Sequence, residues 1–146
     1  MGLIDAIGTG TVAVDTAVFI YLIEEHPDYL SVVRPLFASA ARGDIELVTS
    51  GITLLEVLVV PYRARELGLA ARYEALLAGS RGVRLIDADR TQLRTAAQLR
   101  ALYRIRTPDA LQLAAALSAR CTVFVTNDRH LPTVPELNII QLSQFL

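Results

Sequence analysis

Four acidic residues are the side chains of this sequence whose types and positions best suit catalysis. Asp15 ends a short apolar run, and Asp128 directly follows another. Glu56 and Asp109 each lie near the start of a predicted helix. Carboxylates that converge repel one another and raise one another's pKa values, and a divalent cation between them removes that conflict. Such a cation activates water and stabilises the charge that develops when a phosphodiester is hydrolysed.

Each of these acids also has a structural interpretation at the start of a helix. Asp15 and Asp128 are N-cap candidates, because a carboxylate oxygen accepts hydrogen bonds from exposed helix N–H groups. Thr53-x-x-Glu56 fits a capping box. Thr107-Pro108-Asp109 fits a helix start with a cap, a proline and an acid in the first turn. Taken singly, capping explains each acid.

The surroundings of Asp15 favour the metal interpretation. It lies between Val12-Ala13-Val14 and Thr16-Ala17-Val18-Phe19, so the carboxylate is set among apolar residues. Burying a carboxylate without a cation or strong donors is costly. Oxygen ligands without a Cys or His framework favour Mg²⁺ or Mn²⁺ over zinc. The sequence offers no such framework, because it contains one cysteine, Cys121, and two histidines, His26 and His130.

Composition excludes several other kinds of chemistry. The 146 residues include 14 basic ones, all of them Arg, so mechanisms that need a lysine, such as a Walker A loop or a Schiff base, are excluded. The hydrophobic fraction of 53% is enough for a buried core, and we expect one domain over residues 1–146. We expect no membrane span, and MGLIDAIGTG lacks the features of a signal peptide. We therefore expect a cytoplasmic protein.

The basic residues are concentrated in the middle of the chain. Residues 63–106 contain ten Arg and four acids, whereas the remainder contains four Arg and eleven acids. A basic segment attached to an acidic remainder suits a phosphate-bearing polymer held near a carboxylate cluster. The alternative is a set of solvated helix faces. These arginines are candidates for phosphate contacts, and the sequence does not rank them.

Alternating elements predict the scaffold that positions these residues. Short β-rich runs are predicted over residues 11–15, 45–49, 83–86 and 121–126, with a possible edge strand over 137–140. Helices are predicted over residues 17–23, 28–41, 54–60, 63–78, 89–103 and 107–120, with Pro61 ending or kinking the third. This alternation predicts an α/β fold with a mostly parallel sheet and helices on both faces. Ligands of such sheets bind beyond the carboxyl ends of the strands.

The contexts of the four acids resemble those of a known family. VAVDTAVFIYLIE, TSGITLLEVLV, TPDALQLAAAL and FVTNDRHL occur in this order, and together they resemble the PIN-domain nucleases, most of all the VapC toxins of type II toxin–antitoxin pairs. The resemblance covers essentially the whole chain. It implies a three-layer sandwich with a four- or five-stranded sheet, and a metal-dependent endoribonuclease that uses Mg²⁺ or Mn²⁺ to cut RNA.

The resemblance also implies roles for individual residues and for partners. Asp15, Glu56 and Asp109 match the three most regular acids of the family, and Asp128 matches the more variable fourth. Thr16, Thr126 and Asn127 match positions that commonly line the site. VapC proteins usually form homodimers and are inhibited by a small VapB-like antitoxin, whose C-terminal segment covers the groove and often inserts an Arg among the acids.

Other functions remain open at this point. The chain could be an RNA-processing nuclease outside a toxin pair, or a PIN-like binding module without catalysis. A receiver domain fits poorly because it would need a lysine, which the chain lacks. A haloacid-type phosphatase fits poorly because it would need an Asp two residues after Asp15, where Ala17 stands.

Overall fold

The computed structural model describes residues 2–146 and contains one five-stranded sheet. Its strands are β1 (Gly10–Val14), β2 (Ile45–Ser50), β3 (Val83–Ile86), β4 (Val123–Thr126) and β5 (Asn138–Gln141). The spatial order is β3-β2-β1-β4-β5, and every neighbouring pair is parallel. The α/β fold is confirmed, and the predicted edge strand is present one residue later than expected.

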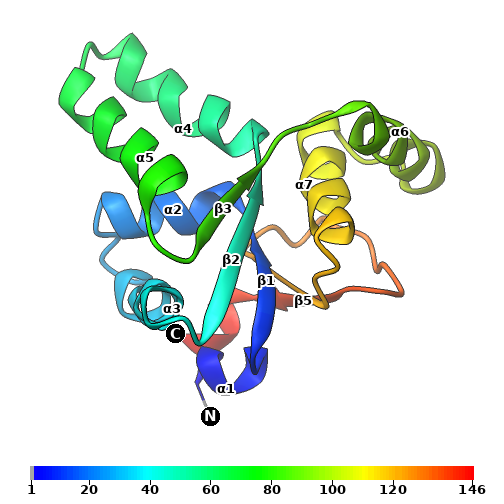
Figure 1. The fold of residues 1–146 in the computed structure, drawn as a ribbon, viewed down its shortest axis with the longest axis horizontal. Coiled ribbons are helices and arrows are strands. Elements are labelled where there is room, and N and C mark those ends of the chain that lie inside the picture. The colour runs from blue at the N-terminus through cyan, green and yellow to red at the C-terminus, as the bar shows by residue number, and fades with distance from the viewer. Residues whose placement is uncertain (1) are drawn as a thin grey trace.

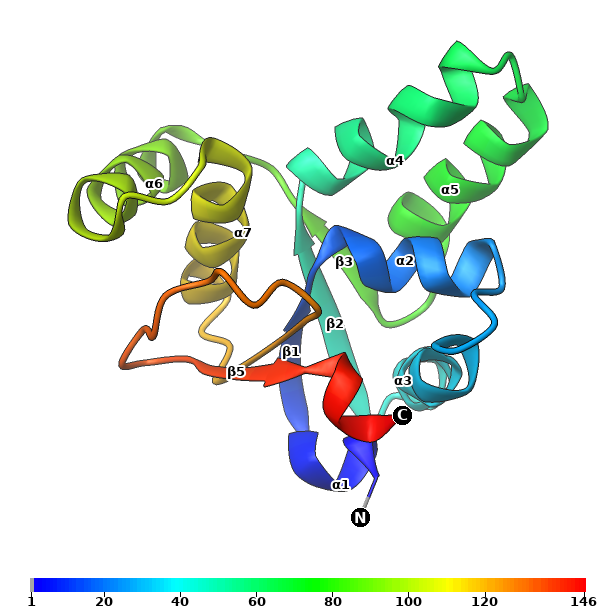
Figure 2. The ribbon, with the colours of Figure 1, turned by 180° about the vertical axis from the view of Figure 1, so that it is seen from behind.

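Helices cover both faces of this sheet (Figures 1 and 2). They are α1 (Leu3–Ile7), α2 (Thr16–Ile23), α3 (Leu30–Arg42), α4 (Ile52–Arg63), α5 (Leu67–Gly79), α6 (Arg90–Tyr103) and α7 (Thr107–Ser118), followed by a 3₁₀ turn, Leu142–Phe145. The α6–α7 pair lies on one face, while α2 to α5 lie on the other. This is the three-layer arrangement that the sequence predicts.

Alternation along the strands divides the core into two clusters. Val12 and Val14 of β1 pack in the cluster beneath α2 to α5, whereas Ala13 between them packs against the α6–α7 side. Successive side chains of a strand point to opposite faces of the sheet, so a strand buried on both faces is apolar throughout. Parallel pairing of Val14 with Val125 then brings the ends of β1 and β4 to the same edge.

The two largest differences from the expected helix boundaries lie at the end of α4 and the start of α5. Pro61 does not end α4, which continues to Arg63 with the proline ring buried. Burial of the proline ring offsets the loss of its N–H donor. The next helix begins at Leu67 rather than at residue 63, because Arg65 adopts a φ of 58° and turns the chain. No helix within residues 2–146 is long and apolar enough to cross a membrane.

Gly82 joins α5 to β3 at a point where only glycine fits. Its φ is 81°, and a Cβ there would lie 2.3 Å from the carbonyl oxygen of Ala40 at the end of α3.

We predict that Gly82→Ala lowers the free energy of unfolding by about 3 kcal/mol, because both the backbone and α3 must shift. Gly79→Ala is the control, since no atom lies within 4 Å of its Cβ. Urea denaturation should show a change for Gly79→Ala of only about 1 kcal/mol or less. Equal stability of the two variants would contradict this account.

Candidate active site

The four acids predicted from the sequence line one cavity of about 270 Å³. They come from separate segments: the end of β1, α4, the first turn of α7, and the loop after β4. The starts of α4 and α7 meet near the carboxyl ends of β1 and β2 (Figure 1). The cavity is lined by Asp15, Thr16, Ala17, Ile20, Glu56, Arg106, Pro108, Asp109, Gln112 and Asp128. The geometry therefore brings together every acid that the sequence singles out.

Asp15 is held by hydrogen bonds to both of its carboxylate oxygens. As the N-cap of α2, it accepts the backbone N–H of Thr16 at Oδ1, over 2.7 Å. The hydroxyl of Thr126 donates to Oδ2, also over 2.7 Å. Thr126 is fully buried, so it supports Asp15 from beneath rather than lining the cavity. The capping interpretation is confirmed for Asp15 and coexists with its place in the cavity.

Burial raises the pKa of Asp15 above its ordinary value. The hydrogen bonds from Thr126 and Thr16 act against this, while the charges of Glu56 and Asp109 raise the pKa further. A carboxyl group with a raised folded-state pKa stabilises the fold only when protonated, and that contribution is lost as the pH rises through the raised value. The ionised form of Asp15 therefore opposes folding. A cation beside it would counter both the burial and the repulsion.

Glu56 and Asp109 have different partners. Glu56 Oε1 accepts the hydroxyl of Thr16 over 2.7 Å, which ties α4 to α2. Asp109 Oδ2 accepts Nε of Arg106 over 3.4 Å, and the Arg106 side chain is 79% exposed. An ion pair this exposed contributes about 0–1 kcal/mol to stability. A cation that binds Asp109 would therefore displace only a weak interaction.

None of the other acids takes part in the helix cap expected for it, although Pro108 and Asp109 do lie in the first turn of α7 as predicted. Gly51 is the N-cap of α4, so Thr53 lies inside the helix and forms no capping box with Glu56. Arg106, not Thr107, is the N-cap of α7 and makes no side-chain cap. Asp128 precedes no helix; its Oδ1 accepts the backbone N–H of His130 over 2.8 Å. Capping therefore does not account for Glu56, Asp109 or Asp128.

The other residues predicted near the acids, Thr16, Asn127 and His130, lie in different surroundings. Thr16 lines the cavity as expected. Asn127 does not line it: its Nδ2 donates to the hydroxyl of Tyr21, and its Oδ1 accepts the backbone N–H of Ser143. The histidine ring of His130 lies 3.3 Å from Asp128 Oδ1 and is 97% exposed.

The donor set suits a hydrated divalent cation better than a closed protein cage. Within residues 2–146, no three His, Cys, Asp or Glu side chains are grouped closely enough to hold one ion together. Mg²⁺ usually keeps several waters and is bound through one or two carboxylates, so this arrangement fits it. Structural zinc sites, by contrast, are mostly closed sets of four protein ligands rich in Cys and His.

Sequence reasoning missed one residue of this cavity, Gln112. Its side chain is only 4% exposed, and its amide contacts Thr16, Thr49, Ser50 and Thr53. One feature of the sequence could have indicated Gln112: it is a polar residue in the otherwise apolar stretch of α7 that follows Asp109. Spacing three residues apart places Asp109 and Gln112 on the same face of the helix.

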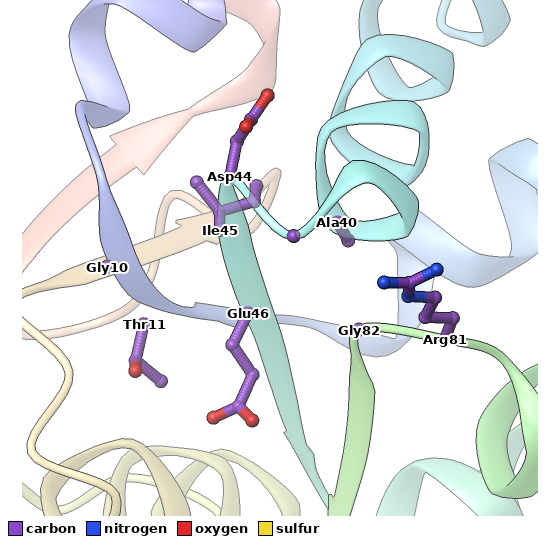
Figure 3. Close-up of a pocket in the computed structure, with 9 residues that line it drawn as sticks. Gly10, Thr11, Ala40, Asp44, Ile45, Glu46, Arg81 and Gly82 are labelled. Atoms are coloured by element: carbon purple, nitrogen blue, oxygen red, sulfur yellow. The ribbon is translucent and has the colours of Figure 1, made fainter.

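A larger hollow of about 470 Å³ lies at the opposite, amino edge of the sheet (Figure 3). Its charged side chains, Asp44, Glu46 and Arg81, point in different directions rather than toward a common centre. Asp44 pairs instead with Arg42 over 3.0 Å. Converging polar groups therefore distinguish the smaller cavity from this one.

Solved structures with a similar fold include proteins of toxin–antitoxin systems. VapBC2 from Rickettsia felis, bound to a DNA fragment from its promoter, matches with a TM-score of 0.70 and 18% identity over 90% of this chain and 98% of that one. DNA-bound VapBC from Salmonella typhimurium matches with a TM-score of 0.63 and 23% identity over 90% and 98%. VapC20 from Mycobacterium tuberculosis, a sarcin–ricin loop cleaving toxin, matches with a TM-score of 0.63 and 18% identity over 77% and 86%.

Comparison of the sequence itself with known proteins and families identifies the family of the chain. No curated protein sequence matches the chain closely enough to count as a relative. The PIN domain model, however, matches residues 12–137, a span that begins in β1 and contains all four cavity acids. Because that match extends over most of the 146 residues, the chain belongs to the PIN domain family.

Proposed function

We propose that this protein is a divalent-metal-dependent endoribonuclease and the toxin of a VapBC-type toxin–antitoxin pair. The observation that carries the proposal is the convergence of Asp15, Glu56, Asp109 and Asp128 on one cavity. Four carboxylates in one cavity are unfavourable without a cation. Membership of the PIN domain family and the likeness of the fold to VapC proteins support the same activity.

Asp15 and Asp109 are the proposed direct ligands of Mg²⁺ or Mn²⁺, and Glu56 and Asp128 complete the site through water. When bound, the ion would supply a water of lowered pKa and would stabilise the developing charge on a phosphodiester. Thr16 and Thr126 hold the carboxylate of Asp15 in place by donating to it. A guanidinium group suits phosphate, and Arg106, which is exposed beside Asp109, is the arginine best placed for that contact.

A side-chain nucleophile is not part of the proposal. Cys121 is buried, and burial raises the pKa of its thiol to about 11, so it carries no thiolate at neutral pH. Hydrolysis by a water molecule therefore fits the residues of the cavity.

The proposed partners follow from the neighbours and from an exposed apolar surface. Several neighbours are VapBC complexes, which supports a small VapB-like antitoxin as partner. Leu55 and Val59 of α4 are 59% and 40% exposed, whereas Leu54 and Leu58 pack against the core. Exposed apolar side chains of this kind suit a protein interface, so we include a homodimer in the proposal. A single domain over residues 1–146 and a cytoplasmic location also remain proposals.

Metal binding is tested by thermal unfolding. We predict that Mn²⁺ at about 100 times its Kd stabilises the protein by about 2.7 kcal/mol, because the ion binds only the folded chain. The corresponding rise in Tm is roughly 8 °C. Asp109→Asn should lose most of this rise while remaining folded without metal. Asp44→Asn, an exposed acid at the opposite edge, should respond like the wild type. An equal response of all three proteins would show that Mn²⁺ binds elsewhere.

Catalysis is tested on RNA with the same variants. We predict that the purified protein cleaves a total-RNA mixture in the presence of Mn²⁺, and that Asp109→Asn abolishes cleavage by removing a metal ligand. Gel analysis of the products, with Asp44→Asn as the active control, measures the difference. Cleavage by Asp109→Asn at the wild-type rate would refute the assignment of the site.

The two alternatives predict different outcomes. A non-catalytic binding module would show neither RNA cleavage nor a Mn²⁺-induced rise in Tm. An RNA-processing nuclease would cleave RNA but would have no small antitoxin gene beside its own. An antitoxin gene directly upstream, whose product abolishes cleavage, would establish the toxin–antitoxin pair.

A further inference from the structure

The buried amide of Gln112 lies where the elements that carry the acids meet. From α7 it reaches Thr16 at the start of α2, Thr53 in α4, and Thr49 and Ser50 at the end of β2. All of these side chains are buried. Buried hydrogen bonds in surroundings of low dielectric constant strengthen one another, and an unpaired member is costly.

One backbone group determines which way the amide points. The N–H of Ser50 lies 3.2 Å from the end of the Gln112 side chain, and a backbone N–H can only donate. The atom that it meets must therefore be the amide oxygen. The amide nitrogen consequently faces the opposite way, toward Thr53 Oγ1 at 2.7 Å and Thr16 Oγ1 at 3.2 Å.

This orientation determines the donor direction of the hydroxyl of Thr16. An amide N–H can only donate, so Thr16 Oγ1 must accept from Gln112. The single proton of that hydroxyl is then free for Glu56 Oε1, which lies 2.7 Å away. Thr53 in turn has Thr49 Oγ1 as a neighbour at 2.7 Å, so its own proton also has an acceptor.

We propose that Gln112 is a positioning residue: through Thr16, it holds the carboxylate of Glu56 as a hydrogen-bond acceptor facing the cavity. The hydrogen bonds run in one direction, from the N–H of Ser50 to Gln112, and from Gln112 through Thr16 to Glu56. Asp109 stands three residues before Gln112 on α7, so the same helix contributes an acid and orients another. The effect on the metal and on catalysis rests on the proposed function, whereas the effect on Glu56 does not.

The test compares Gln112→Met with Gln98→Met. Methionine nearly matches the length of glutamine but has no amide, and Gln98 is an exposed glutamine on α6. A crystal structure of Gln112→Met should show that the Glu56 carboxylate has left its position 2.7 Å from Thr16. Outer groups that orient metal ligands typically contribute 10–100-fold to metal affinity or activity. We therefore expect the Kd for Mn²⁺ to rise and kcat to fall at least tenfold in Gln112→Met, with KM for RNA nearly unchanged. Gln98→Met should match the wild type in every measurement.

A double-mutant cycle with Thr16 separates positioning from a purely structural contribution. Thr16→Val removes the hydroxyl, while Thr16→Ser keeps it and should restore Mn²⁺ affinity and kcat to within about twofold of the wild type. If Gln112 acts through Thr16, Gln112→Met should add little further loss to Thr16→Val. Independent effects, in which the two losses multiply, would overturn the proposal.

Two further outcomes are decisive. An unmoved Glu56 carboxylate in Gln112→Met, or a Mn²⁺ Kd within twofold of the wild type, would overturn the proposal even if stability falls. If the wild type itself neither binds Mn²⁺ nor cleaves RNA, the proposed function fails, and the position of Glu56 in the crystal structure alone decides the role of Gln112. Should Gln112→Met not fold, Gln112→Asn, which keeps a shorter amide, replaces it in each comparison.

Discussion

The carboxylate of Asp15 is the group on which the arrangement of this site depends. Its partial burial at the junction of β1 and α2 raises its pKa, and the charges of Glu56 and Asp109 raise it further. Hydrogen bonds from Thr16 and Thr126 hold it but do not lower its pKa to the ordinary value. The exposed pair of Arg106 with Asp109 contributes at most about 1 kcal/mol and involves no atom of Asp15. A negative charge on Asp15 is thus unfavourable in the fold, in a place where a cation would be favoured.

A rigid sheet makes this concentration of charge possible. Five parallel strands with apolar residues on both faces bring their carboxyl ends to one edge, and helices begin directly from that edge. Asp15, Glu56 and Asp109 therefore project from a strand-to-helix junction or from helices, and Asp128 projects from the loop that directly follows β4. The buried amide of Gln112 links α7, α4 and α2 across the floor of the cavity. Packing and hydrogen bonding together keep the carboxylates near one another against their mutual repulsion.

Much of the fold and of the site could be predicted from the sequence. Alternating apolar runs and helical periods predict the parallel sheet, and the strand-to-helix junctions predict which acids meet at its edge. The rule that a proline ends a helix failed at Pro61, because α4 stays helical through the buried proline to Arg63. The capping box at Thr53 was also wrong, because α4 begins at Ile52 and the Thr53 hydroxyl is used in the buried network instead.

The sequence by itself determined the order of the elements, the apolar faces and the four acids, because periodicity and residue type act locally along the chain. Tertiary structure alone decided how these acids are held. Thr126 supports Asp15 from 111 residues away in the chain, and Gln112 contacts Thr16 across 96 residues. It also directed Asn127 to Tyr21 and away from the cavity. Hydrogen-bond partners so distant in sequence are selected by packing in three dimensions, which no local pattern records.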